Sequence, residues 1–404
     1  MFRKFEVSEE TGGPGRLSRK LMLLVAILTA SALVFSACSS DDDSSSSSDS
    51  GSTTTAANGD APWWCGDEPV TLGIQDGIGL NAWSKESLRQ VKLEAAKCPS
   101  IEETIVVNAQ LDPQKATSGI QSMVAQGADA IVIIPDAGVC AELPAMRQAT
   151  QRGVTVAVWA ADGCGEVPAD YQSYSDWDTV ANGETLTRWL AEQMGGKGNL
   201  AFFGGPAGNL VDQQSVEGMY KALEDYPDIK VLGDVSEENW PVTNWDPAEA
   251  QKVAAATLAK YPQIDGLLDI YGASVAGEIK AFEAAGREIP PIGTTVLNDL
   301  ACTWEKRQGT DKEFDMAAIS NRNWIGRLAV RQAVANVNDI ENDDPTSLPL
   351  PIQEDSTDPD MLPRCAPGEI PDYDWTNQIS DEEMDDLLAD IKSEQDSGSE
   401  GSGS

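Results

Sequence analysis

The chain has no histidine among its 404 residues, and none of its cysteines stand in a CxxC spacing. The missing histidines exclude a Ser-His-Asp triad and every general acid or base that uses an imidazole. Without imidazoles or closely spaced thiolates, the chain also lacks the usual ligands of zinc. We therefore expect no metal site and no cofactor.

Basic residues are also scarce, since 28 Lys and Arg stand against 66 Asp and Glu and give a net charge of −38. So acidic a protein repels nucleic acid and anionic lipid head groups. Nucleic acid is therefore excluded as a partner. The acidity itself is typical of a well-solvated, salt-adapted surface and does not identify a ligand.

Long apolar runs are absent apart from residues 21–35, which are short for a membrane span. Basic residues precede this run, and small residues follow it up to Cys38. This order is typical of an export signal over residues 1–37, with a single anchoring helix as the alternative. The small residues before the cysteine resemble a bacterial lipobox, which implies lipid at Cys38 and a protein anchored to the outer face of the bacterial cell membrane. The Ser- and Asp-rich residues 38–60 then form a flexible tether.

An even number of cysteines follows the tether. In an oxidising compartment this predicts disulfides, although six cysteines allow fifteen pairings. The six are Cys65, Cys98, Cys140, Cys164, Cys302 and Cys365.

From residue 69 onward, short apolar runs alternate with helical patterns, and the series restarts near residue 176. Strands separated by single helices predict βαβ units with parallel sheets, so the expected fold class is α/β with two doubly wound lobes. The expected strands of the two halves are residues 70–74, 104–109, 130–135 and 154–160, then 199–205, 229–235, 266–271 and 290–296. Later come a long helix near 324–338, an acidic helix at 381–391 and a disordered tail.

Tryptophan and Asn or Asp recur just after these strands. In open α/β sheets a ligand binds at the carboxyl ends of the strands. Planar aromatic faces beside amides and carboxylates suit the apolar faces and hydroxyls of sugars and polyols. The candidate ligand-binding residues are Asp76, Asn81, Trp83, Asp136, Trp159, Asp162, Trp177, Asp178, Trp245, Tyr271, Asn298, Asp299, Asn321 and Trp324.

Each candidate also has a simpler interpretation. An isolated Trp at a helix start is often a core residue. An Asp before a helix is often an N-cap, which applies to Asp76, Asp178 and Asp246.

The chain resembles the type I periplasmic sugar-binding proteins, in the group of ribose-binding protein, over roughly residues 70–338. The resemblance rests on Asn-Ala-Trp after the first strand and on residues 110–135, 195–205, 217–234, 244–252 and 272–286. It implies two lobes, joined by three crossings of the chain, that close on a ligand. The implied lobes are 61–175 plus 321–345, and 176–320 plus 346–375, followed by 376–404 as acidic helix and tail.

The resemblance carries over Asn81 and Trp83 from the first lobe and Trp245 from the second. The family's polar positions are changed: its Arg in the second lobe is Ser215 here, and its Asn-Asp pair is Tyr271 followed by Gly272. An Arg supplies five donors in a fixed fork. We therefore expect a flatter pocket with fewer hydrogen bonds, for a cyclic polyol, an unusual or aryl-linked saccharide, or a similar neutral molecule.

The implied fold also favours three cysteine pairs. Cys140 and Cys164 follow neighbouring strands near the cleft, Cys65 and Cys98 flank the first strand and helix, and Cys302 with Cys365 fastens the C-terminal segment.

The resemblance implies a monomeric substrate-binding lipoprotein of an ABC transporter and not an enzyme, and the missing histidines agree with that. It would capture a sugar, polyol or glycoside and deliver it to a membrane permease. One alternative is a sensor that binds the same kind of ligand and signals through a chemotaxis or signalling partner. Another is an exported carbohydrate-active enzyme with paired carboxylates, but no such pair stands out in the repeat pattern.

Overall fold

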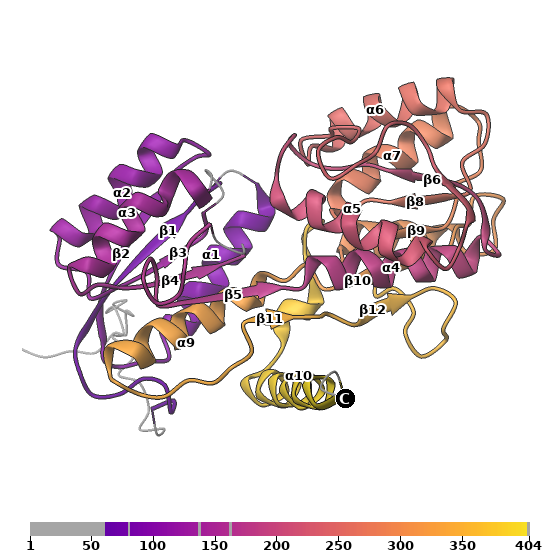
Figure 1. Cartoon of the computed structure of the whole chain (residues 1–404). Helices are drawn as coiled ribbons and strands as arrows, with labels where there is room; N and C mark the ends of the chain where they lie inside the picture. Colours follow the sequence, from indigo (N-terminus) through magenta and orange to yellow (C-terminus); the bar gives the residue numbers. More distant parts are fainter. Residues whose placement is uncertain (1–60, 80, 136–138, 161–163, 402–404) are drawn as a thin grey trace, which may run out of the picture. The chain divides into compact units, whose positions relative to one another are not determined.

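The computed structural model describes residues 61–79, 81–135, 139–160 and 164–401 (Figure 1). The expected export signal, the tether and Cys38 lie outside the described residues, as do Asp136 and Asp162. Within the described ranges, no helix is both long and apolar enough to cross a membrane.

The first lobe is built on a six-stranded sheet in the order β11-β5-β4-β3-β1-β2, and every strand pair in it is parallel. Helices cover both faces, because side chains of alternate residues in the central strands enter two separate cores. One core includes residues of α1 and α9, and the other includes residues of α2 and α3. The strands are β1 (Val70–Asp76), β2 (Ile101–Asn108), β3 (Ala130–Ile133), β4 (Thr155–Trp159), β5 (Ser173–Trp177) and β11 (Ser347–Leu348). The helices are α1 (Ala82–Ala95), α2 (Pro113–Ala125), α3 (Val139–Gln151) and α9 (Gly326–Val337).

The second lobe repeats this plan with the order β12-β10-β9-β8-β6-β7, in which only the edge pair of β10 and β12 is antiparallel. The strands are β6 (Lys197–Phe202), β7 (Asp228–Val231), β8 (Gly266–Leu268), β9 (Ile292–Thr295), β10 (Met316–Ile319) and β12 (Ile352–Asp355). The helices are α4 (Thr179–Gln193), α5 (Leu210–Leu223), α6 (Pro247–Lys260), α7 (Gly272–Ala284) and α8 (Asn298–Arg307).

Two glycines set the helix spacing in this lobe. A Cβ on Gly218 of α5 would lie 2.0 Å from the carbonyl oxygen of Val180 in α4. A Cβ on Gly277 of α7 would lie 1.9 Å from the carbonyl oxygen of Pro247 in α6. Both helix pairs therefore approach more closely than any side chain at these positions would allow.

The chain passes between the two sheets after β5, after β10 and after β11. Two doubly wound α/β lobes joined by three crossings confirm the expected fold class. The third crossing falls between β11 and β12, because β11 pairs with β5 of the first sheet. The sequence-based boundary instead assigned all of residues 346–375 to the second lobe. The sequence-based list of strands also lacked β5, because its sequence SYSDW is short and half polar.

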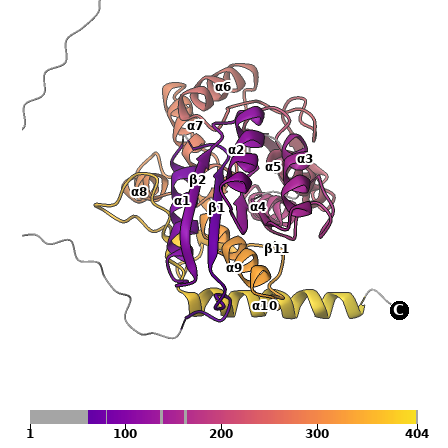
Figure 2. The ribbon, with the colours of Figure 1, turned by 90° about the vertical axis from the view of Figure 1, so that its left-hand side faces the viewer.

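The C-terminal segment adds a short 3-10 helix, η2 (Trp375–Gln378), and the long helix α10 (Asp381–Gly401). Figure 2 shows α10 passing below α9. Its apolar side chains Met384, Leu388 and Ile391 are buried in the core of the first lobe. The helix is longer than the expected 381–391, because a helix that is already nucleated extends at low cost. Within the added part, Gln395 Nε2 donates to the Ser347 carbonyl oxygen at 2.9 Å.

Three disulfides are present, and they are the three expected pairs. The Cα atoms of Cys65 and Cys98 are 5.3 Å apart, those of Cys140 and Cys164 are 5.1 Å apart, and those of Cys302 and Cys365 are 4.4 Å apart. The last bond joins α8 to the C-terminal segment.

Candidate functional site

A pocket lies where the strand ends of the two lobes meet, and it contains about 480 Å³ of space between atoms, including the part open to solvent. Both lobes and the crossing after β10 contribute to its walls. The lining residues are Ile78, Asn81, Trp83, Ala160 and Trp177 from the first lobe, Val211, Trp245, Ile270 and Tyr271 from the second, and Arg322 from the crossing.

The first-lobe wall contains two indoles of the pocket lining, and a third indole supports them from behind. The rings of Trp83 and Trp159 are stacked with centroids 5.7 Å apart, and Trp177 meets Trp83 edge-on at 6.4 Å. Trp159 is fully buried, so it supports Trp83 and does not line the pocket itself. The Nε1 of Trp83 donates to the carbonyl oxygen of Asn321 at 2.8 Å, which fixes the ring against the crossing.

The second-lobe wall consists of Trp245 and Tyr271, whose ring centroids are 6.4 Å apart. Trp245 has a φ of 54°, an uncommon backbone conformation for a residue with a side chain. Its indole lies so close to Gly205 that a Cβ there would be 2.1 Å from the ring. The Tyr271 amide donates to Asp269 Oδ1 at 2.8 Å, and burial raises the pKa of the Tyr271 phenol to about 12. The neutral hydroxyl both donates and accepts.

Arg322 was not among the predicted site residues. It has a φ of 72°, and its guanidinium lies over the Trp177 ring with Cζ 4.1 Å from the centroid. Nε and Nη1 are buried with no hydrogen-bond partner among the described residues. Burial lowers the pKa of Arg322 to about 10, against the opposing pull of Asp176, Asp212 and Asp374, so the group stays charged at neutral pH.

The expectation of a flatter pocket with fewer hydrogen bonds rested on the loss of the family's Arg, whereas Arg322 places a guanidinium in the lining. Ser215, which stands where the family has its Arg, is buried and hydrogen-bonds within its own helix. A different part of the chain therefore provides the guanidinium. The signal available in the sequence was an Arg in the polar run SNRN directly after the buried strand β10.

Three predicted residues hold the loops around the pocket. Asp76 accepts hydrogen bonds from Ser84 Oγ at 2.7 Å and from the Gly79 amide at 3.0 Å, and it does not line the pocket. Asn81 lines the pocket and also caps α1. Asp178 is the N-cap of α4, which is the simpler interpretation given above for an Asp before a helix.

Four other predicted residues do not lie in the pocket, and the backbone amide of each donates a hydrogen bond to the C-terminal segment. The Asn298 amide donates to the carbonyl oxygens of Ala366 and Ile370 at 3.3 and 3.2 Å, and the neighbouring Asp299 is exposed. Asn321 and Trp324 are buried within the crossing after β10. The segment that they contact lies further along the chain, so the position of a residue at a strand end could not reveal this contact.

Buried carboxyl groups lie near the second-lobe wall. Burial raises the pKa of Asp212 to about 6, although Asn209 and the Gly205 amide donate to it. Burial, together with the charge of Glu278, raises the pKa of Asp269 well above its ordinary value. Burial raises the pKa of Glu278 to about 7. Within the described residues, no group of three or more His, Cys, Asp or Glu side chains is arranged to hold a metal ion.

Two doubly wound lobes with an aromatic pocket at their facing strand ends define a two-lobed solute-binding protein. Residues 80–340 match the family model described as a periplasmic binding protein domain. Because this match spans more than half of the chain, the chain belongs to that family.

Curated relatives and solved structures agree with this assignment. A xylitol-binding protein of Mycolicibacterium smegmatis is 27% identical over 262 residues, covering 63% of this chain and 70% of that protein. The D-xylose-binding periplasmic protein of Escherichia coli is 28% identical over 222 residues, covering 54% of this chain and 63% of that protein. An ABC transporter periplasmic solute-binding protein from Actinobacillus succinogenes, solved with bound D-allose, has a TM-score of 0.57 and 23% identity, covering 70% of this chain and 96% of that chain.

The resemblance to type I periplasmic sugar-binding proteins is thereby confirmed. Proteins of this family are exported and bind solutes, and they are not enzymes. The carbohydrate-active enzyme considered from the sequence is therefore set aside.

Proposed function

We propose that this protein captures a neutral sugar or polyol between its two lobes and delivers it to the membrane permease of an ABC importer. The observation that carries the proposal is a pocket with aromatic walls from both lobes and a buried guanidinium at the crossing. The names of its relatives, which bind xylitol and D-xylose, support the same ligand class.

The walls suit such a ligand physically. A sugar ring or polyol chain presents C–H groups that pack against indole faces, and its hydroxyls need fixed donors and acceptors. Trp83 and Trp245 provide faces from opposite lobes, and Asn81, Tyr271 and Arg322 provide polar atoms. A ligand that contacts both lobes favours the closed arrangement by its differential affinity for it.

We further propose that Cys38 carries lipid and that residues 38–60 tether the binding lobes to the outer face of the membrane. The support is the order of basic, apolar and small residues before Cys38 and the polar run after it. In cells that make the full chain, Cys38→Ser should move the protein from the membrane fraction to the soluble fraction. Unchanged membrane association of Cys38→Ser would contradict the lipid anchor.

The ligand class is tested by a thermal-shift screen followed by titration calorimetry, with xylitol, D-xylose, D-ribose and myo-inositol as test compounds. A compound that binds only the folded state raises the apparent melting temperature. Failure of every neutral sugar and polyol to do so would contradict the proposal.

The pocket is tested with Trp83→Ala and Trp245→Ala. Each removes one indole face, and we expect the affinity for the best compound to fall about 10- to 100-fold. Trp63→Ala is the matched control, because Trp63 is 50% exposed and lies outside the pocket lining. Equal affinities of the two pocket variants and the control would show that the ligand binds elsewhere.

A further inference from the structure

The C-terminal segment runs from the second lobe to the first, and it lies beyond the part of the chain that matches the family model, which ends at residue 340. We propose that residues 365–391, here called the strap, form a fourth connection that limits how far the lobes separate and holds the crossing at residues 320–325 in place. Because the pocket has walls from both lobes, this restraint controls access to it. The inference does not depend on which solute binds.

The first part of the strap is fastened to α8 of the second lobe. The disulfide between Cys302 and Cys365 joins the two covalently. Asn298, at the start of α8, adds hydrogen bonds from both ends of its amide. Its Oδ1 accepts from the Ala366 amide at 2.8 Å, and its Nδ2 donates to the carbonyl oxygens of Ala366 and Ile370 at 3.3 and 3.2 Å.

The backbone at the start of α8 also contacts the strap. The amides of Asn298 and Asp299 donate to the carbonyl oxygens of Tyr373 and Pro371, both at 2.9 Å. The amides in the first turn of a helix have no partner inside it. The strap therefore caps this helix, and it moves with the second lobe.

Trp375 is the last residue of the strap that packs on the second lobe. Its ring contacts the core formed by α7, α8 and their strands, and its Nε1 donates to Glu354 Oε1 of β12 at 2.8 Å. The guanidinium of Arg364 lies over the same ring, with Cζ 3.9 Å from the centroid. The strap is thus part of the second lobe as far as Trp375.

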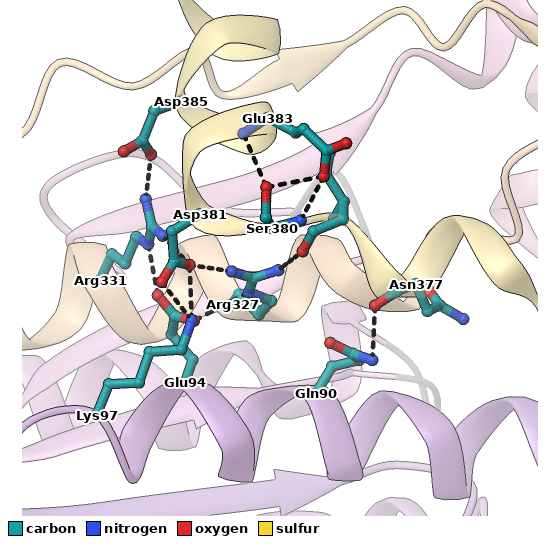
Figure 3. A network of polar contacts seen from close by, with 11 residues as sticks. Gln90, Glu94, Lys97, Arg327, Arg331, Asn377, Ser380, Asp381, Glu383 and Asp385 are labelled. Carbon is teal, nitrogen blue, oxygen red and sulfur yellow. Dashed lines mark hydrogen bonds and ion pairs between the residues drawn. The ribbon is translucent and has the colours of Figure 1, made fainter.

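From Ile379 onward the strap belongs to the first lobe. Ile379 packs against the core of that lobe, and its carbonyl oxygen accepts from Arg327 Nη1 at 2.7 Å. Figure 3 shows the ion-pair network that follows. Glu94 of α1 accepts from Arg331 Nε at 2.6 Å and from Arg327 Nε at 2.9 Å, and Arg331 also donates to Asp385 of α10 at 2.6 Å. This network and the buried face of α10 fix the strap end to the first lobe.

Only residues 375–379, here called the link, therefore join the two fastened parts. Most of the link is the 3-10 helix η2, with Asp374 as its N-cap. Four residues of 3-10 helix rise about 8 Å, whereas four extended residues span about 13–14 Å. The link can lengthen by only about 5–6 Å, and only if η2 unwinds. Asp374 Oδ1 opposes unwinding, because it accepts from the Thr376 amide at 2.8 Å and from the Thr376 hydroxyl at 2.6 Å.

The link also lies against the crossing that carries Arg322. Asp374 Oδ2 accepts from the Asn321 amide at 3.0 Å. The hydroxyls of Thr376 and Ser320 are 2.7 Å apart. All of these partners are buried, so water does not compete for the bonds.

Asn377 holds the crossing on the other side of Arg322. Its Oδ1 accepts from the Trp324 amide at 3.2 Å, and its Nδ2 donates to Asn323 Oδ1 at 2.9 Å. Its carbonyl oxygen accepts from Gln90 Nε2 of α1 at 3.2 Å, as Figure 3 shows. The backbone of the crossing is therefore bonded to the link both before and after Arg322.

These bonds reach the pocket through the crossing. Arg322 lines the pocket with a φ of 72°, and the neighbouring Asn321 carbonyl oxygen accepts from Trp83 Nε1 at 2.8 Å. The Asn321 peptide units thus connect the strap on one side with a pocket indole on the other. Holding the crossing also holds two residues of the pocket lining.

Lobe opening requires the backbone of the crossings to rotate, because hinge motions are absorbed by a few residues in the connections. A rotation at residues 320–325 must break the bonds from Asp374, Thr376 and Asn377, or it must carry η2 along and stretch the link. Either way the strap adds a cost to opening. Removing the restraint shifts the equilibrium toward separated lobes.

The test measures the distance between the lobes in the full-length, ligand-free protein by double electron–electron resonance. Spin labels are attached to p-acetylphenylalanine introduced at positions Glu103 of β2 and Lys230 of β7, which are exposed. This chemistry leaves the three disulfides intact. Both strands are the edge strands opposite to those that lead into the crossings, so a rotation at the crossings moves them furthest.

The first variant removes the side-chain bonds at nearly constant volume, by combining Thr376→Val with Asn377→Leu. We expect a new population whose label distance is longer than the main distance of labelled wild type by about 5 Å or more. Thr310→Val, at an exposed position of the second lobe, is the control and should leave the distances unchanged.

The second variant lengthens the link and keeps every side chain. Four residues, Gly-Ser-Gly-Ser, are inserted between Gln378 and Ile379, and we expect longer label distances here too. The same insertion after Gly309, in an exposed turn of the second lobe, is the control.

Circular dichroism and thermal unfolding establish that each variant is folded. Longer label distances in either variant support the restraint and assign it to the bonds or to the length of the link. If both folded variants keep the label distances of wild type, the inference is wrong, whatever solute the protein binds.

Discussion

Two buried acidic sites, one in each lobe, show opposite pKa shifts. Glu94 in the first lobe is fully buried between Arg327 and Arg331. Burial alone would raise the pKa of Glu94, but Arg331, Lys97 and Arg327 outweigh burial and hold that pKa below its ordinary value.

Two buried acids of the second lobe have no such partners among the described residues. Asp269 and Glu278 are fully buried, and neither forms an ion pair with a cation among the described residues. Burial raises the pKa of both carboxyl groups. The same kind of group is thus charged in one lobe and partly protonated in the other, and the difference is made by nearby arginines and not by depth of burial.

The largest effect is expected for Glu94→Gln. Removing one partner of a buried ion pair leaves Arg327 and Arg331 with uncompensated charge, which costs about 3–5 kcal/mol in the free energy of unfolding. Denaturant unfolding measures the loss, and Glu102→Gln at an exposed position is the control. A loss below about 1 kcal/mol would mean that Asp381 and Asp385 alone suffice to pair the two arginines.

The next effect is the pH dependence of wild type. The raised pKa values are about 6 for Asp212 and about 7 for Glu278 and Asp374. At a pH between the ordinary pKa of a carboxyl group and these raised values, the folded protein binds more protons than the unfolded chain. Stability should therefore fall as the pH rises through this window. We expect an apparent melting temperature several degrees higher near about pH 5 than near about pH 8.5, measured by calorimetry. A melting temperature that rises between about pH 5 and about pH 8.5 would contradict the raised pKa values of these three carboxyl groups.

Glu278→Gln should reduce that slope. Glutamine cannot ionise, so at about pH 8.5 the variant avoids two like charges in one buried site and should melt a few degrees higher than wild type. At about pH 5 the two proteins should differ little. Glu224→Gln, on the surface of the same lobe, controls for the change in net charge.

Lys97→Ala should have the smallest effect. Lys97 is 34% exposed at the edge of the network, where it bonds Glu94 at 2.7 Å and Asp381 at 2.6 Å. Arg327 and Arg331 still compensate Glu94 after its removal, so we expect a loss of about 0.5–1 kcal/mol in denaturant unfolding. A loss as large as that of Glu94→Gln would show that the network acts as one unit.

Much of the fold could be predicted from the sequence because the central strands are continuous apolar runs with helical patterns between them. The strands β3 and β9 have every residue buried, and both were expected. The strands β5 and β11 were harder, because one is half polar and the other has two residues. Their strand character depends on their neighbours in the sheet and not on their own composition.

The pocket could be predicted only in part. Trp83, Trp177, Trp245 and Tyr271 were found because each lies at a strand end, and the structure places all four in the lining. Their contact with a ligand stays a prediction. Arg322 was missed because the polar run SNRN places it after a strand but does not show that a left-handed turn sets its guanidinium against Trp177.

The indole cluster of the first lobe has a spectroscopic consequence. Rings as close as those of Trp83, Trp159 and Trp177 couple their electronic transitions, and the guanidinium of Arg322 places a fixed charge beside one of them. Fixed aromatic packing of this kind gives a near-ultraviolet circular dichroism signal. Any solute that enters beside Trp83 will disturb that signal, so the protein carries its own optical reporter of occupancy.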